Sequence, residues 1–285
     1  IAGQTSATLT VSPTATTTYW VRRVGNTACS GATGGVTATV TVNQPNAVIT
    51  VANNNAAPGD FIWNGQLSSD WGNANNWYQK TSTGYTLAGV APTLADNVFV
   101  VPSSVGGSCI STSNAPIVNV LTLGIGTAQD VFIHQDSELA LDVNTTLEVT
   151  GDFYSLGQFS AGLNSVVEFK GGDDAKVLIT NPQSNKFYNL SMNKSNTSKE
   201  LTLESNIHVE NEVSFTQGNI RLNQFTLDLG SNGFFAGESE DSYAYCDCPT
   251  GRIVRTVPIG ANATVNAGNL GIAITPAVNM GTVKV

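Results

Sequence analysis

The feature that most constrains the fold is a long succession of short apolar segments, separated by turns, that begins after Pro116. Clear examples lie at 139–143, 147–153 and 207–215, where apolar and polar residues tend to alternate. None keeps the 3.6-residue apolar spacing of an amphipathic helix. Many short strands without helices between them are typical of a sandwich, a barrel or a solenoid. The chain is therefore predicted to be all-β.

Recurring phrases and turn residues favour the solenoid. The segments 139–141 and 147–149 resemble 201–203 and 207–209, although the spacing between such phrases is irregular. Glycine and asparagine, which tolerate the left-handed conformations of tight turns, lie between the strands. These residues are Gly151, Gly157, Gly162, Gly171, Gly172 and Gly218, with Asn144, Asn164, Asn206, Asn211 and Asn223. We therefore predict a parallel β-helix (β-solenoid) over 117–285, in which each strand pairs with the coils above and below it.

Residues 1–44 carry another pattern, in which apolar and polar residues alternate in three segments: 8–11, 18–22 and 36–42. This period is that of half-buried strands. Three strands cannot close a sandwich, which usually takes about seven. Residues 1–44 are thus predicted to be the back half of a sandwich whose front half precedes Ile1. The segment 45–59 contains Pro45 and Pro58, lacks periodicity and is predicted to be a linker.

Three of the four tryptophans, Trp63, Trp71 and Trp77, lie within fifteen residues of one another, directly after the linker. If they are exposed together, the indoles form a platform for sugar stacking and make glycan contact. If they are buried together, they plug the end of the solenoid, where an unpaired apolar cross-section would otherwise meet water. We favour the second interpretation and predict that 60–116 is an N-terminal cap with the first coils.

The low charge of the chain limits its partners. Only 12% of residues are charged, against roughly 25% in ordinary soluble domains. Together with plentiful Thr, Asn, Ser and Gly, this is typical of secreted β-structure. With 12 basic and 21 acidic residues, the chain would repel a phosphate backbone, so nucleic acid is not expected as a partner. No apolar run approaches the roughly 20 residues of a spanning helix, so membrane insertion is not expected either.

The four cysteines, Cys29, Cys109, Cys246 and Cys248, lack the paired CxxC spacing of a zinc site, and a disulfide is the favoured interpretation. Cys246 and Cys248 would point the same way if their segment were extended, which would strain a bond between them. One of the two is therefore a candidate partner for Cys109. Cys29 is expected to pair outside these residues.

Acidic residues offer the one enzymatic hypothesis, a polysaccharide lyase or hydrolase built on the β-helix. A lyase would use clustered carboxylates to hold calcium against a uronate, and a basic residue to remove a proton. The candidates are Asp173 and Asp174, and an acidic loop with two nearby arginines: Glu238, Glu240, Asp241 and Asp247, with Arg252 and Arg255. We favour the interpretation that these residues form a solvated loop without catalytic function, and we assign no catalytic residue. No cofactor is expected, except calcium if the loop binds a ligand.

Histidine is scarce, and neither copy predicts a metal site. His208 and Glu210 alternate with Ile207 and Val209, which turns both polar side chains outward together. One histidine and one carboxylate are too few ligands for a metal. We therefore predict a solvated strand face at this position.

The sequence at 12–21, with Cys29 and the strand at 36–42, resembles the back half of the immunoglobulin-like repeats of large bacterial surface proteins. That resemblance implies a spacer module whose missing half would carry the partner of Cys29. From Phe61 onward, a series of motifs is similar to the β-helical regions of giant cell-surface proteins exported by the type IX secretion system of gliding bacteria. In order, the motifs are 62–65, 69–71, 75–77, 96–98, 149–152, 187–190 and 250–255.

The resemblance implies an extracellular or cell-surface location and contact with the secretion machinery during export. Such proteins usually continue into further domains, so we expect a chain that extends beyond Val285. The leading hypothesis is a structural or adhesive module that contacts surface glycans or neighbouring cells through many weak contacts. The alternatives are the carbohydrate-active enzyme described above and a purely mechanical stalk or filament.

Overall fold

The computed structural model describes residues 17–21, 36–40, 56–102, 114–180, 182–183 and 185–285. The chain divides into two compact units, Ile1–Val48 and Ile49–Val285. In the first unit, β1 (Thr17–Val21) pairs antiparallel with β2 (Val36–Val40). The rest of the predicted immunoglobulin-like module, including Cys29, lies outside the described residues.

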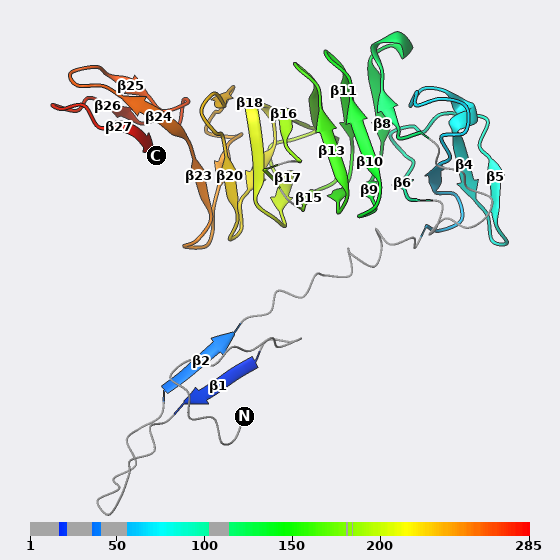
Figure 1. The fold of residues 1–285 in the computed structure, drawn as a ribbon, viewed down its shortest axis with the longest axis horizontal. Helices are drawn as coiled ribbons and strands as arrows, with labels where there is room; N and C mark the ends of the chain where they lie inside the picture. Colours follow the sequence, from blue (N-terminus) through cyan, green and yellow to red (C-terminus); the bar gives the residue numbers. More distant parts are fainter. Residues whose placement is uncertain (1–16, 22–35, 41–55, 103–113, 181, 184) are drawn as a thin grey trace, which may run out of the picture. The chain divides into compact units, whose positions relative to one another are not determined.

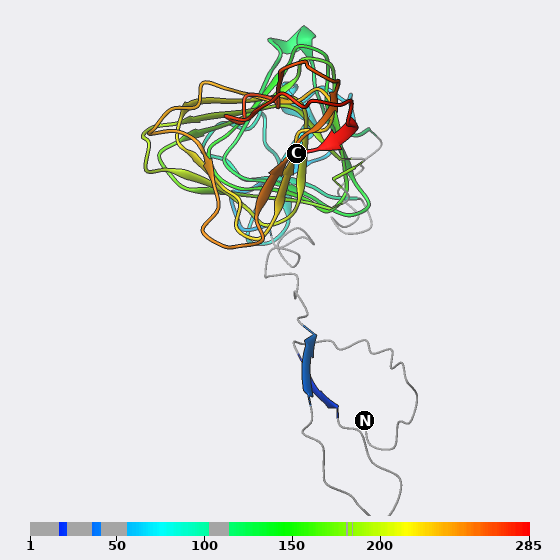
Figure 2. The same ribbon diagram turned by 90° about the vertical axis from the view of Figure 1, so that its left-hand side faces the viewer.

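The second unit is a β-solenoid of about six turns, which confirms the predicted fold class (Figure 1). Its coils superimpose when the solenoid is viewed along its length (Figure 2). The only helical elements in the described part are two short 3-10 turns, η1 (Ala74–Asn76) and η2 (Val120–Thr122). No helix there is long and apolar enough to cross a membrane.

Three sheets form the walls of the solenoid, and the strands are as follows. The short sheet contains β7 (Ile117–Val118), β10 (Glu138–Leu141) and β13 (Gln158–Ala161). The eight-stranded sheet contains β8 (Ile125–Ala128), β11 (Thr146–Val149), β14 (Val166–Gly171), β16 (Phe187–Lys194), β18 (Ile207–Gln217), β20 (Thr226–Asp228), β21 (Phe234–Ala236) and β23 (Arg252–Val254).

The ten-stranded sheet contains β3 (Phe61–Trp63), β4 (Trp77–Lys80), β5 (Tyr85–Leu87), β6 (Val98–Val100), β9 (Val131–Ile133), β12 (Phe153–Ser155), β15 (Ala175–Ile179), β17 (Glu200–Leu203), β19 (Asn219–Arg221) and β22 (Ala244–Tyr245). One coil runs from the short sheet to the eight-stranded sheet and then to the ten-stranded sheet, as β10, β11 and β12 show. Coils pair in parallel, with Leu147 opposite Val167 and Phe153 opposite Val177.

Alternation along the strands builds one continuous core. In β11, Leu147 and Val149 are fully buried, whereas Thr146 and Glu148, which alternate with them, are partly exposed. The same in-out pattern recurs in β10 and β17. Each fully buried Leu, Val or Phe side chain contributes roughly 1.5–3 kcal/mol through removal of apolar surface from water. The core extends from Phe61 to Phe235.

Three of the five asparagines that were predicted to lie in tight turns have the expected left-handed backbone conformation. Asn144, Asn164 and Asn223 have φ of 56°, 59° and 48°, in the left-handed region. The first two also stack, because Asn164 Nδ2 donates to Asn144 Oδ1 at 3.0 Å. Asn206 and Asn211 are not left-handed; instead Asn206 Oδ1 accepts from the Thr226 amide, and Asn211 Nδ2 donates to Asn189 Oδ1. Their role is to link coils rather than to reverse the chain.

The three tryptophans are buried at the start of the solenoid, with exposed fractions of 1% for Trp63, 2% for Trp71 and 0% for Trp77. Trp77 makes edge-to-face contacts with Trp63 and Trp71, at centroid distances of 4.9 and 4.8 Å. Trp63 and Trp77 are opposite residues of β3 and β4, in the antiparallel meander β3-β4-β5 at one end of the ten-stranded sheet. Burial of all three agrees with the predicted cap. A sugar platform needs an exposed ring face, and these rings have none.

The carboxyl-terminal residues differ from the prediction of coils up to Val285. The last parallel pairs are β19–β22 and β20–β23. Beyond them the chain folds back into two antiparallel pairs, β24 (Thr256–Ile259) with β27 (Gly281–Lys284) and β25 (Val265–Asn266) with β26 (Ala273–Ile274). Left-handed residues at turns reverse the chain there: Asn262, Gly268, Asn269 and Gly271. Alternation alone does not distinguish these reversals from further coils.

Candidate functional site

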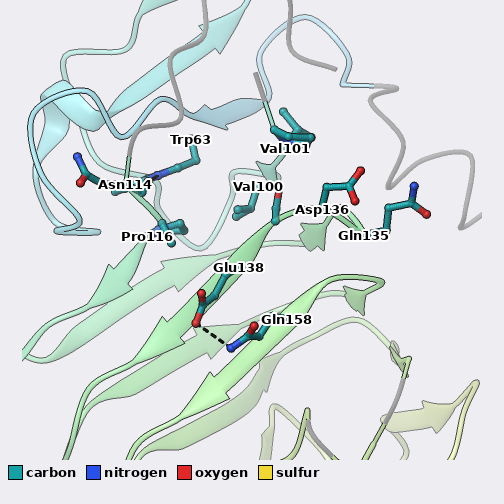
Figure 3. A pocket seen from close by; sticks show the side chains of 12 residues that line it. Trp63, Val100, Val101, Asn114, Pro116, Gln135, Asp136, Glu138 and Gln158 are labelled. Carbon is teal, nitrogen blue, oxygen red and sulfur yellow. Dashed lines mark hydrogen bonds between the residues drawn. The ribbon is translucent and has the colours of Figure 1, made fainter. Parts of the chain in front are cut away.

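A cleft of about 360 Å³ opens where the ten-stranded sheet passes into the short sheet (Figure 3). We call it the polar cleft. It is lined by residues of three successive coils: 114–116 before β7, 135–137 between β9 and β10 with Glu138 at the start of β10, and Gln158 at the start of β13. Trp63 and residues 100–102 complete it. Its volume lies at the lower end of the range of small-ligand sites.

Glu138 and Gln158 form the side of the cleft on the short sheet. They lie opposite each other on neighbouring parallel strands, so their side chains emerge on the same face. Gln158 Nε2 and Ser160 Oγ each donate to Glu138 Oε1 at 3.1 Å. Both hydrogen bonds use the same carboxylate oxygen. This arrangement orients the Glu138 carboxylate, a group that can accept several hydrogen bonds, including those from hydroxyl groups.

His134 positions the second acidic residue, Asp136. The His134 ring is 4% exposed, and its Nδ1 accepts a hydrogen bond from the Asp136 backbone amide at 3.1 Å. Burial lowers the His134 pKa, and the Asp136 charge opposes that shift to a smaller degree. The ring is therefore neutral at pH 7, with its proton on Nε2. It holds a turn from which the Asp136 side chain projects, 67% exposed.

The floor of the cleft is apolar and closely packed. Trp63, Val100 and Val101 are each exposed by no more than 2%. Trp63 Nε1 donates to the Asn114 carbonyl at 2.6 Å, and Asn114 Nδ2 donates to the Gly65 carbonyl at 2.7 Å. The same indole therefore belongs to both the cap and the cleft floor. Because the floor is tied to the cap, the cleft is preorganised.

The cleft is negatively charged. Asp136 and Glu138 line it, and among the described residues that line it there is no Lys or Arg. Carboxylates accept hydrogen bonds from hydroxyl groups but repel carboxylate, sulfate and phosphate groups. The cleft is therefore suited to an uncharged polyhydroxyl ligand. A uronate, which the lyase hypothesis requires, fits this electrostatic environment poorly.

The structure separates the predicted acidic loop into two parts. Glu238, Glu240 and Asp241 are exposed in the turn after β21. Asp247 lies in the next turn and forms an ion pair with Arg221, whose hydrogen bond lowers the Asp247 pKa. Within the described ranges, no group of three or more His, Cys, Asp or Glu residues has the arrangement of a metal site.

Asp173 and Asp174 lie in a second cleft, of about 500 Å³, with Asp130 and Asp152. Their neighbours show that this cleft is built from turn caps. Asp130 Oδ1 accepts from the Asp152 amide at 2.7 Å, and Asp174 Oδ1 accepts from the Glu200 amide at 3.1 Å. Burial raises the Asp130 pKa, as does the charge of Asp152. Asp130, Asp152 and Asp174 thus satisfy backbone amides of the next coil.

The remaining predicted residues are readily placed. His208 and Glu210 lie on the outer side of β18 while Ile207 and Val209 are buried, and Glu210 pairs with Lys186 at 2.7 Å. The predicted solvated face does not hold for His208, because its ring packs against Gly230, its Nδ1 is buried without a hydrogen-bond partner among the described residues, and burial lowers its pKa. Cys246 and Cys248 are free thiols, and both are half-buried. Cys109 lies outside the described residues.

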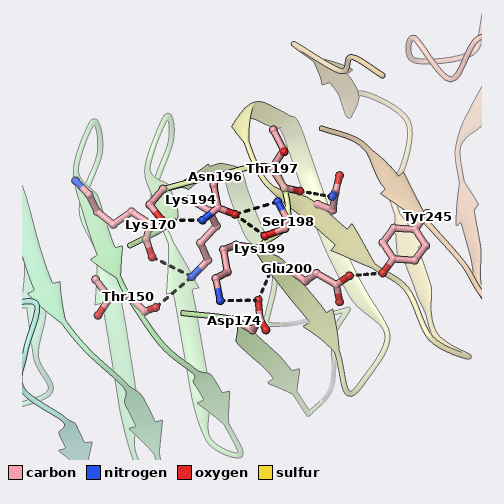
Figure 4. A network of polar contacts seen from close by, with 12 residues as sticks. Thr150, Lys170, Asp174, Lys194, Asn196, Thr197, Ser198, Lys199, Glu200 and Tyr245 are labelled. Carbon is pink, nitrogen blue, oxygen red and sulfur yellow. Dashed lines mark hydrogen bonds and ion pairs between the residues drawn. The ribbon is translucent and has the colours of Figure 1, made fainter. Parts of the chain in front are cut away.

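A buried lysine is a feature that we did not single out from the sequence (Figure 4). Lys194 is 2% exposed, and its Nζ donates to the carbonyls of Lys170 and Thr150 at 2.9 and 3.1 Å. The three residues belong to three consecutive coils, which Lys194 thus connects. Burial lowers its pKa to about 8. Strand alternation contains the signal, because Lys194 follows the inward residues Leu190 and Met192 at intervals of two.

Trp63 was the one cleft residue singled out from the sequence; the polar residues of the cleft were missed, although a compositional signal was present. His134, Asp136 and Glu138 lie within five residues in a chain that is only 12% charged. Comparison with known proteins adds no assignment: no family model matches this chain, and no curated protein or solved structure does so.

Proposed function

We propose that this chain is a stiff extracellular module of a large cell-surface protein, and that its polar cleft contacts neutral glycans. The observation that carries the proposal is the pair Glu138–Gln158, held across two coils beside Asp136, with no cationic side chain among the described lining residues. Carboxylate and amide groups of this kind hydrogen-bond sugar hydroxyls. The resemblance to β-helical regions of bacterial surface proteins supports the extracellular setting.

Stiffness follows from the construction of the solenoid. Each coil is joined to its neighbours by parallel backbone pairing and by one apolar core that continues through the coils. A rod of this type holds a contact site at a fixed position. A single cleft of this size would bind weakly, and display of many copies on a cell surface would supply the strength through avidity.

The test is binding to an array of neutral and uronic-acid oligosaccharides, followed by titration calorimetry with the strongest neutral ligand. We expect Glu138→Ala and Asp136→Ala each to weaken binding about tenfold or more, because each removes a charged hydrogen-bond acceptor. Glu210→Ala removes a surface carboxylate elsewhere and serves as the matched control. Binding that is stronger for uronates, or unchanged in both cleft variants, would refute the glycan role of this cleft.

The second candidate is a glycoside hydrolase, favoured by one observation: two carboxylates, Asp136 and Glu138, line the same cleft. Glycosidases act through such a pair. Incubation of the bound oligosaccharides with the protein, followed by chromatography of the products, separates the two functions. Cleavage lost in Glu138→Gln would establish the enzyme. Absence of both binding and cleavage would leave a mechanical spacer.

A further inference from the structure

The last turn between two solenoid walls contains two thiols that approach each other closely. Cys246 and Cys248 lie between β22 and β23, with their Sγ atoms 3.6 Å apart. The chain bends at Asp247 and Cys248 instead of continuing as a strand, so the two side chains converge across the bend. We propose that Cys246 and Cys248 are a reversible oxidation site, at which the two thiols close to a disulfide across Asp247. This inference is independent of the glycan cleft.

The Cys246 sulfur is held in place from several sides. Its Sγ lies 3.0 Å from the Asn223 carbonyl oxygen, and the Cys248 amide donates to it at 3.3 Å. The Cys248 carbonyl oxygen lies 2.5 Å from the same sulfur. Gly251 packs on a further side, since a Cβ added there would lie 2.5 Å from this sulfur and 2.0 Å from the Asn223 oxygen. The backbone is therefore shaped around Cys246. This thiol is the fixed member of the pair.

Cys248 is the member that moves. A disulfide needs an S–S distance of about 2.05 Å. Cys248 is half-buried in the bend, and its neighbours Asp247 and Pro249 are exposed. A side-chain rotation combined with a small shift of this bend brings its sulfur to Cys246, and the strands β22 and β23 keep their pairing.

The chemistry requires an external disulfide as oxidant, such as oxidised glutathione. One protein thiolate attacks a sulfur of that disulfide, forming a mixed disulfide and releasing one small thiolate. The second protein thiolate then attacks the protein sulfur of the mixed disulfide and releases the other small thiolate. The two released thiolates take up the protons that the protein thiols lost. Two electrons thus pass from the cysteine pair to the oxidant.

The consequence is local. The new ring encloses only three residues, so it removes little conformational entropy from the unfolded chain. It does restrain the turn that joins the last parallel strands, whose partners are β19 and β20. We expect slower amide exchange at Arg252 and Ile253 and only a small rise in melting temperature.

The experiment uses the full chain with Cys29→Ser and Cys109→Ser, so that only this pair remains. After incubation with oxidised glutathione, we expect the intact mass to fall by two hydrogen atoms, no thiol to be alkylated, and dithiothreitol to reverse both changes. The further variant Cys248→Ser is expected to form only a glutathione adduct at Cys246. Two persistent thiols, or two glutathione adducts on one chain, would overturn the proposal.

The wild-type chain supplies the second measurement. Non-reducing peptide mapping after the same oxidation is expected to recover Cys246 and Cys248 linked within one peptide. A bond from either residue to Cys109 or Cys29 would contradict the assignment. Because this readout does not depend on glycan binding, its failure leaves the proposed function untouched, and the reverse is also true.

Discussion

Trp77 donates its indole N–H to the Trp71 carbonyl at 2.8 Å, and the two rings meet edge to face at a centroid distance of 4.8 Å. This contact lies at the first coil of the solenoid, where Trp71 also approaches Gly126 of β8. The geometry is that of a packed core, with the polar indole atom of Trp77 satisfied by the backbone.

Removal of this cap should destabilise the solenoid. We expect Trp77→Ala to lower the free energy of unfolding by about 3–5 kcal/mol, the usual effect of a large-to-small change in a core. Trp77→Phe keeps most of the ring packing but loses the hydrogen bond, so about 1 kcal/mol is expected. Denaturation in guanidinium chloride measures both. An unchanged midpoint for Trp77→Ala would contradict the capping role.

The buried ammonium group of Lys194 predicts a pH dependence. Its pKa is about 8 in the folded chain and has a reference value of 10.5. The unfolded chain therefore holds more protons at this residue between these values, and stability rises with pH through this window. Below pH 8 both states are charged and the burial penalty is fully present. Above about pH 10.5 the lysine is neutral in both the folded and the unfolded chain, and the burial penalty no longer applies.

The measurement is the difference in unfolding free energy between the wild type and Lys194→Met, at pH 7.5 and pH 10. We expect this difference to shift in favour of the wild type by roughly 1–3 kcal/mol as the pH rises. Lys186→Met, which removes a more exposed lysine of the same wall, is the control and should show no such shift. Identical pH behaviour of the two variants would mean that Lys194 titrates normally.

Gly151 allows two coils to approach closely. A Cβ added there would lie 2.0 Å from Asp130 Oδ1, the atom that accepts a hydrogen bond from the Asp152 amide. Gly151→Ala should therefore displace that carboxylate and destabilise the chain by about 1–3 kcal/mol. Gly84→Ala meets no atom within 4 Å and is the matched control. Thermal denaturation of both variants tests the prediction, and equal melting temperatures would refute it.

Substitution of Asn164 tests whether the left-handed backbone conformation selects asparagine at the turns. Its φ of 59° strains a residue with a Cβ, and its side chain also bonds to Asn144. We expect Asn164→Ala to cost about 1–2 kcal/mol, whereas Asn164→Gly should recover part of this loss by relieving the backbone strain. If alanine and glycine are equivalent in guanidinium denaturation, the conformation is not what selects asparagine there.

The wall-forming part of the fold could be predicted from the sequence, because burial follows a period of two that is visible in strands such as β11 and β17. The same period, applied to β16, would also have placed Lys194 inside. The cluster of His134, Asp136 and Glu138 was visible in the sequence, but the pairing that forms the polar cleft could not be predicted. Glu138 and Gln158 meet only because their strands lie in one register, and the irregular coil length hides that register from the sequence.

Two further features depend on backbone geometry that composition does not determine. The reversal of the chain after β23 rests on the φ angles of a few turn residues, among them Asn262 and Asn269. The convergence of Cys246 and Cys248 likewise depends on a bend at Asp247. In an extended segment, a disulfide between the two residues would be strained. At both the chain reversal and the cysteine pair, the sequence gives the residue types but does not determine their backbone conformations.

Parallel pairing also determines how the solenoid responds to tension. Its strands run across its long axis, so a force that pulls its two ends apart loads the inter-coil hydrogen bonds a few at a time and peels coils from an end. Leu147 lies opposite Val167, which places twenty residues in that coil. Its release adds roughly 60–70 Å of extended chain. A solenoid built in this way lengthens in steps under tension and absorbs work with each coil that it releases.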